Sequence, residues 1–122
     1  MTTFLEGRHT GEFLIMKEED DYSVETVTVA SGAGKLSAGT VLGVVTASGK
    51  YAVYANGASD GTQAAKAVLY DNVDATSADV SAVVVVRLAE VNAAELVWDA
   101  SNSGSDITAG LADLKALGIV AR

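Results

Sequence analysis

The sequence predicts a small, mainly β domain with a single α-helix near its C-terminus, an α+β fold. Short alternating stretches rich in Val and Thr lie between clusters of Gly, Asn, Asp and Ser, and only one stretch, late in the chain, has a helical apolar period. The 122 residues suffice for one domain with one core. Apolar residues form 49% of the chain but aromatic residues only 6%, so closely packed layers of Ala and Val are expected.

Residues 1–22 differ from the remainder and are predicted to form a flexible N-terminal arm. Glycines and isolated charges interrupt the apolar pattern, one apolar group follows at 13–16, and a charged run occupies 17–21. Like charges repel, and so little apolar surface does not offset the entropy lost when the segment becomes ordered. The chain therefore divides into an arm, residues 1–22, and one β-rich domain, residues 23–122.

Strands are predicted at 23–30, 41–46, 51–54, 64–70 and 80–88. In the first, Val27 and Val29 share one face and the neighbouring Thr residues the other. The stretch 64–70 also has helical propensity, but flanking loop signals leave room for only one or two turns, which favours a strand. The valines at 83–86 are apolar on both faces and indicate a central strand.

Gly-containing connections join these strands. Residues 47–50 are predicted to form a hairpin turn, because the connection is short and contains Gly. Asn56-Gly57 and Asp60-Gly61 mark a loop, since both dipeptides favour positive φ.

One helix is predicted over 105–117, followed by a short strand at 119–121. Its apolar residues recur with helical spacing at Ile107, Leu111, Leu114 and Leu117. Ser105 is expected to cap the first turn, Asp106 to favour the positive end of the helix dipole, and Gly118 to end the helix.

Charge and composition exclude several classes of partner. The net charge of −8 argues against nucleic acid and anionic membranes, which bind basic surfaces. Without cysteine the chain has neither disulfides nor thiolate metal sites. The run 82–86 is far shorter than the roughly 20 residues of a membrane helix. The N-terminus shows no signal-peptide pattern, so the product is expected to stay in the cell that makes it.

Three short motifs resemble catalytic or ligand-binding sequences but lack required partners. Residues 57–61 match G-x-S-x-G, yet the only histidine, His9, precedes the serine, so a Gly-rich loop is favoured. Residues 32–35 resemble part of a phosphate-binding loop, but Val29 stands where that motif needs Gly, and Leu36 stands where it needs a hydroxyl residue. The series Asp99, Ser101, Ser103 opens like a calcium loop, but Gly110 stands where the closing Glu is needed.

The carboxylates at 18–21 and the single histidine are interpreted as solvated, because adjacent acids on an arm lack fixed geometry and metal sites need three or four convergent donors. We therefore predict no enzyme activity and no catalytic, cofactor or metal site. Trp98, the only tryptophan, is expected either to cover the core or to anchor an interface.

Several segments are characteristic when taken in order: GEFL at 11–14, VTVASG at 27–32, LSAGTVLG at 36–43, GKY at 49–51, AVLY at 67–70, VDA at 73–75, VVVVR at 83–87, AEV at 89–91, LVW at 96–98 and LGIVAR at 117–122. This ordered set resembles the head decoration protein family of tailed phages, the group that includes the phage lambda decoration protein. Each segment alone is weak, and their order along nearly the whole chain carries the specificity.

The resemblance implies a small β-clip-type domain that forms homotrimers, binds the threefold positions of the expanded icosahedral head and resists the pressure of packaged DNA. The implied partners are the major capsid protein and the chain itself, and the implied location is the outer surface of the virion, after synthesis in the bacterial host cytoplasm. An arm that orders against the capsid would use the apolar residues Phe4, Phe13, Leu14, Ile15 and Met16. Trp98 is a candidate for the trimer interface.

The sequence departs from the family at two points. Relatives commonly have proline near the end of the strand that starts at Tyr51 and after the tryptophan, whereas this chain has no proline, so looser loops are expected. Relatives often carry a basic residue where Val24 stands, and a capsid contact by that residue does not carry over.

Two other functions stay open at this point. One is a β-rich binding or adhesion module of a virion tail or surface. The other is a trimeric dUTP-hydrolysing enzyme, which also uses small β-clip subunits, but the C-terminus here is an apolar helix and strand rather than a Gly-rich nucleotide cover.

Overall fold

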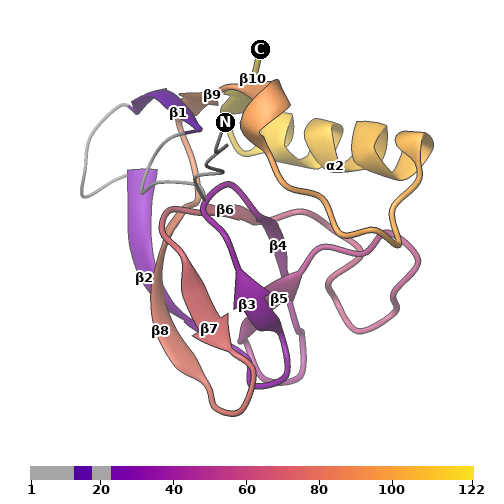
Figure 1. The fold of residues 1–122 in the computed structure, drawn as a ribbon. Coiled ribbons are helices and arrows are strands. Elements are labelled where there is room, and N and C mark those ends of the chain that lie inside the picture. The colour runs from indigo at the N-terminus through magenta and orange to yellow at the C-terminus, as the bar shows by residue number, and fades with distance from the viewer. Residues whose placement is uncertain (1–12, 18–22) are drawn as a thin grey trace, which may run out of the picture.

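Five short strands of the computed structural model close into a barrel in the order β2-β5-β4-β6-β8 (Figure 1). The structure describes residues 13–17 and 23–122. The barrel strands are β2 (Val24–Val29), β4 (Val41–Val44), β5 (Tyr51–Val53), β6 (Ala67–Leu69) and β8 (Val80–Val85). β2 and β8 form the longest ladder, antiparallel from Val24↔Val85 to Val29↔Val80, and a parallel contact between Val29 and Tyr51 closes the barrel.

A second layer, which we call the cap, packs against one side of the barrel. It consists of the helix α2 (Gly104–Ala116) and a sheet of β1 (Leu14–Lys17), β9 (Ala89–Val91) and β10 (Ile119–Ala121) in the order β1-β9-β10. β9 pairs antiparallel with β1 and parallel with β10. Figure 1 shows the helix lying across the top of the barrel, beside this sheet. A 3₁₀ turn, η1 (Ala93–Glu95), follows β9.

A two-stranded ribbon covers another part of the barrel. It pairs β3 (Gly34–Leu36) antiparallel with β7 (Val73–Ala75). Leu36, Val73 and buried Ala75 pack against the apolar residues of the barrel interior. The ribbon thus completes the inner core.

Alternating residues of β6 and β8 serve two separate cores. Ala67, Leu69 and Val84 point into the barrel, where they pack with Val29 and Leu42. The intervening residues Val68 and Val85 face outward and pack under the cap. Because successive side chains of a strand point to opposite faces, one wall of the barrel supplies both cores.

The predicted fold class, mainly β with one C-terminal helix, is confirmed. The predicted strands at 23–30, 41–46, 51–54 and 64–70 correspond to β2, β4, β5 and β6, each of them shorter than expected. The predicted strand at 119–121 is β10, and the turn at 47–50 joins the antiparallel strands β4 and β5.

The predicted strand 80–88 proved to be too long. β8 ends at Val85, and β9 begins at Ala89 in a different sheet, so the chain passes from barrel to cap at residues 86–88. β8 pairs with strands on both sides, as predicted for a central strand. Val83 nevertheless remains 36% exposed, because it faces outward beyond the cap.

The helix begins with a different cap from the predicted one. Ser103, rather than Ser105, is the N-cap residue, and it forms a capping box with Asp106: the Asp106 N–H donates to Ser103 Oγ, and the Ser103 N–H donates to Asp106 Oδ2 at 2.8 Å. Gly118, with φ of 83°, follows the C-cap Leu117 as predicted. The loop predicted at 56–61 is present, and Gly61 has the expected positive φ, 113°, whereas Gly57 has no positive φ.

The capping box makes helix stability depend on pH. Hydrogen bonds from the Ser103 N–H and the Asn56 side chain hold the pKa of Asp106 below its usual value of 3.8. Its stabilising effect is therefore complete well above the unfolded-state pKa of 3.8 and is lost as the pH falls through the lowered pKa of the folded state. We expect Asp106→Asn to be less stable than the wild type at pH 7, with the difference shrinking below pH 4, in urea unfolding followed by circular dichroism.

Ser103→Ala is the matched control for this prediction. It removes the partner hydroxyl but keeps the Asp106 carboxyl and its two main donors, so its cost of about 1 kcal/mol should change less with pH than that of Asp106→Asn. Equal stability of Asp106→Asn and wild type at pH 7 would contradict the assigned role of this carboxylate.

Candidate functional site

Phe13, one of the residues expected to contact the capsid, is part of the core under the cap. Its side chain is only 1% exposed, and its ring meets Tyr70 edge-on with centroids 6.4 Å apart. Its carbonyl accepts a hydrogen bond from the Asn92 N–H at 2.8 Å. In this structure Phe13 therefore ties the start of β1 to the domain, and its side chain is not available to a partner.

The other expected capsid-contact residues fall into two groups. Leu14, which is half-buried, Ile15 and Met16 lie in β1, at one edge of the cap sheet, where Leu14 pairs with Val91 and Met16 with Glu90. Phe4 lies outside the described residues, as do His9 and the carboxylates at 18–21. The segment that enters β1 is thus the place where the N-terminal residues join the domain.

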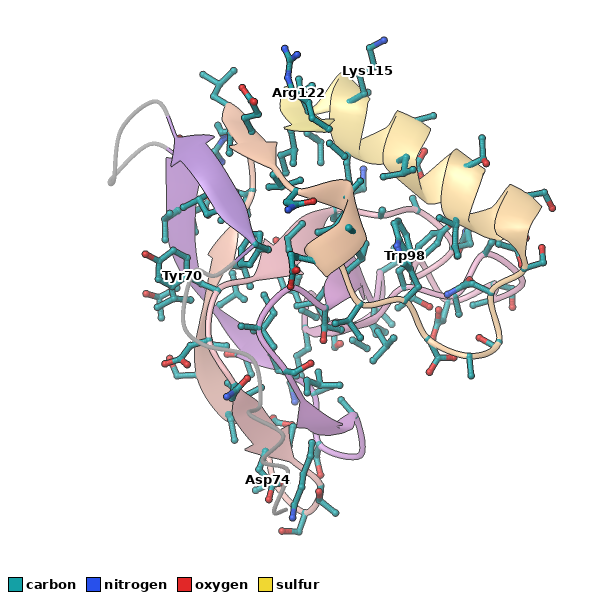
Figure 2. All side chains as sticks on the ribbon, turned by 45° about the horizontal axis from the view of Figure 1, so that its top comes forward. Tyr70, Asp74, Trp98, Lys115 and Arg122 are labelled. Carbon is teal, nitrogen blue, oxygen red and sulfur yellow. The ribbon has the colours of Figure 1, made fainter. Side chains whose placement is uncertain are left out.

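Trp98 covers part of the core, one of the two roles that the sequence left open. Its ring packs against buried Tyr54 in a T-shaped arrangement, with centroids 5.8 Å apart, yet the residue is only half-buried. It also lines a surface cavity of about 220 Å³ together with Lys35, Leu36 and Asp99. Figure 2 shows Trp98 beneath α2, on the side of the helix that faces the barrel. Trp98 is therefore packed on one edge and accessible on another.

Gly110 is a residue that the sequence reasoning missed. It lies in the middle of α2 and is buried against Trp98, so that a Cβ atom there would come within 2.6 Å of Cζ3 of the tryptophan and 3.0 Å of the Tyr54 ring. Glycine in a helix interior costs stability relative to alanine, and its presence here allows the two aromatic rings to pack directly on the helix backbone. The only signal in the sequence was a glycine inside a helical pattern.

Tyr54 connects the barrel side of the core to the first turn of α2 by a hydrogen bond. Its hydroxyl donates to the carbonyl oxygen of Asp106 at 2.8 Å, and its side chain is fully buried. Burial raises the pKa of this hydroxyl, and the nearby carboxylates Asp113 and Asp106 add to that effect. The hydroxyl therefore stays protonated and keeps its role as donor.

The loop that contains G-x-S-x-G is held in place by hydrogen bonds within the loop and to the end of β4. Asp60 accepts hydrogen bonds from the Thr62 N–H at 3.0 Å and the Thr62 hydroxyl at 2.6 Å, which hold the pKa of Asp60 below its usual value. The backbone N–H of Thr46 donates to the Asp60 carbonyl oxygen, so the loop is bound to the end of β4. The segment between β5 and β6 is a loop, without the strand–turn–helix of a nucleophile elbow.

The remaining motifs are also turns. Residues 32–35 lead from β2 into β3, with Gly32 and Gly34 at positive φ, and no helix follows to receive a phosphate. Asp99 accepts hydrogen bonds from the Ser101 N–H and hydroxyl, as in an Asx turn before the helix. Within residues 13–17 and 23–122, no three His, Asp or Glu side chains are grouped as metal ligands, and no helix is long and apolar enough to cross a membrane.

Charged side chains join the elements at the far end of the barrel from the cap. Asp79 accepts hydrogen bonds from the Ser31 N–H at 2.7 Å and from Lys50 Nζ at 2.6 Å, linking the turns next to β2, β5 and β8. These bonds, the one from Lys50 above all, hold the pKa of Asp79 below its usual value. Exposed pairs of this kind contribute little to stability and serve mainly to position the turns.

The fold is that of a small β-barrel module with a cap of one helix and one sheet on one side. The comparisons with known proteins assign this module more closely. Residues 3–119 match the family model of the bacteriophage lambda head decoration protein D, which covers nearly the whole chain. The chain belongs to this family of phage head decoration proteins, which makes it a structural component of a phage capsid. A search of the curated proteins found no match.

The packing of Trp98 on α2 can be tested at Gly110. We expect Gly110→Ala to lower the free energy of unfolding by about 1–3 kcal/mol, because the added methyl group would overlap the rings of Trp98 and buried Tyr54, which must shift to accommodate it. Urea unfolding followed by Trp98 fluorescence measures this loss.

Gly104→Ala is the matched control on the same helix. No atom lies within 4 Å of a Cβ placed there, so this variant should be neutral or slightly more stable. If both variants unfolded at the same urea concentration, the close contact between helix and tryptophan would be wrong.

Proposed function

We propose that the chain binds as a homotrimer at the threefold positions of the expanded icosahedral head and stabilises it against the pressure of packaged DNA. The match of residues 3–119 to the head decoration family carries this proposal. The partners are the major capsid protein and two further copies of the chain. We also propose that the protein has no enzyme activity, is made in the host cytoplasm and resides on the outer surface of the capsid.

The N-terminal segment is proposed as the part that binds the capsid. It enters the domain at β1, at the edge of the cap sheet, so that residues 1–12 precede a fixed attachment point at Phe13. An extended segment can add to an exposed strand edge of the lattice, with backbone hydrogen bonds for affinity and apolar side chains for specificity. Among the expected contacts, Phe4 precedes the attachment point, whereas Leu14, Ile15 and Met16 follow it in β1.

Stabilisation of the head follows from selective binding. A protein that binds the expanded lattice and not the disrupted one stabilises it by RT ln(1 + [L]/Kd), about 2.7 kcal/mol per site at a hundredfold excess over Kd. Ordering one segment costs about 2–5 kcal/mol, but three segments on one trimer bind at high effective concentration after the first has docked. The trimer therefore attaches more tightly than one subunit does.

Deletion of residues 1–12 should leave a folded domain that no longer attaches to heads. The deletion stops before Phe13 because this buried ring belongs to the core, and its loss would cost about 3–5 kcal/mol by itself. Cosedimentation with expanded heads measures attachment, and circular dichroism checks the fold. Attachment at unchanged affinity would contradict the proposed role of the segment.

Within the full chain, Phe4→Ala should weaken attachment, while Thr2→Ala serves as a matched control on the same segment. We expect roughly a tenfold loss for Phe4→Ala, in line with removal of one well-buried aromatic contact of about 1.4 kcal/mol or more. Equal saturation curves for the two variants would show that Phe4 is not a contact.

A further inference from the structure

Asn56 and Gly57 form an exposed turn outside the N-terminal segment that is proposed to bind the capsid. They are the two central residues of the turn, which the Ala58 N–H closes by donating to the Ala55 carbonyl oxygen at 3.0 Å. Both residues are exposed, and they lie in the loop between β5 and β6. Asn56 is the only asparagine of the chain that is followed by glycine. The reactivity of this pair depends on how its side chain and its backbone are held.

An asparagine followed by glycine can lose its amide group in water, which is one reason why asparagine is among the thermolabile residues. The backbone nitrogen of the glycine attacks the side-chain carbon Cγ, so that a C–N bond forms and closes a five-membered succinimide ring. The Cγ–Nδ2 bond breaks, and Nδ2 leaves as ammonia with the proton of the attacking N–H. Water then opens the ring at either carbonyl group, which gives aspartate or isoaspartate. The reaction consumes water, releases ammonia and needs no oxidant or reductant.

Gly57 leaves the attacking nitrogen open. No atom lies within 4 Å of a Cβ placed on this glycine, so the space around it is empty. Among the residues that the structure describes, none accepts a hydrogen bond from the Gly57 N–H. The nearby Asp60-Gly61 pair differs, because the Gly61 N–H donates to Gln63 Oε1 at 2.8 Å. The free N–H and the open space both favour attack by Gly57.

The side chain of Asn56 links this loop to the first turn of α2. Its Nδ2 donates to Asp106 Oδ1 at 2.9 Å, and its Oδ1 accepts from the Tyr54 hydroxyl at 3.2 Å. Asp106 is the carboxylate of the capping box, and its carbonyl oxygen also accepts from the Tyr54 hydroxyl. The nitrogen that would leave as ammonia is therefore one of the donors that hold Asp106 in place.

We propose that Asn56 is a site of spontaneous deamidation and that its conversion loosens the start of α2. The product carries a carboxylate where the amide donated, so a hydrogen bond to Asp106 is replaced by repulsion between like charges. In isoaspartate the main chain also runs through the former side chain, which adds a carbon atom to the turn. Both products weaken the link between the β5–β6 loop and the capping box.

Peptide mapping by mass spectrometry tests the site. The full chain is kept at mildly alkaline pH, and the gain in mass on replacing an amide by an acid is followed at each asparagine. We expect Asn56 to convert about tenfold faster or more than Asn72, which is also exposed but precedes branched Val73; tenfold is about 1.4 kcal/mol of activation free energy. Gly57→Ala should retain the fold, since a Cβ has room there, and should slow the conversion by a similar factor. Equal rates at Asn56 and Asn72, or in Gly57→Ala and wild type, would overturn the proposed site.

Asn56→Asp reproduces one product and tests its effect on the helix. We expect a lower urea midpoint than that of wild type at pH 7, because the new carboxylate faces Asp106. Asn56→Ala is the matched control: it removes the same donor without adding a charge, so its midpoint should lie between the other two. Circular dichroism measures all three unfolding curves. A midpoint for Asn56→Asp equal to that of wild type would show that the conversion does not loosen α2.

Discussion

The wall formed by β6 and β8 is the constraint on which the rest of the structure depends. One face of the wall closes the barrel through Leu69 and Val84, and the other face supports the cap through Val68 and Val85. A change of register by one residue would exchange the two sets of side chains and damage both cores together. Apolar residues on both faces are therefore required, and this explains the uninterrupted valines of β8. A chain with few aromatic residues can build two layers in this way, because the aliphatic side chains of β8 fill one core on each face of the same strand.

The strands with clear alternation or long apolar runs could be predicted from the sequence, because their burial pattern is local. Four other strands could not be predicted in this way: β1, β3, β7 and β9. Each has only three or four residues, and each exists because a partner far along the chain supplies its hydrogen bonds, as β9 does for both β1 and β10. The N-cap shows the same limit on a smaller scale. Ser103 and Ser105 are equally good caps by type, and the choice between them depends on the reach of Asp106, which is three residues after Ser103.

For the functional surfaces, the sequence identified residue types but not their positions in space. Phe13 looked like a contact residue of an arm, yet its ring fits a gap beside Tyr70 that no sequence pattern reveals. Trp98 could be assigned to a core or an interface only by its neighbours, above all Gly110. Family membership, by contrast, was already evident from the order of short segments.

The cap sheet brings together three parts of the chain that are widely separated in sequence: residues 14–17, 89–91 and 119–121. The barrel, by comparison, lies within residues 24–85. During synthesis the barrel strands are therefore all available while the sheet still lacks one of its edges. The parallel partner of β9 arrives only with Ile119, a fully buried residue of the core under the cap. Non-local pairings of this kind form late, so Phe13 has no complete binding place until the last strand has been made.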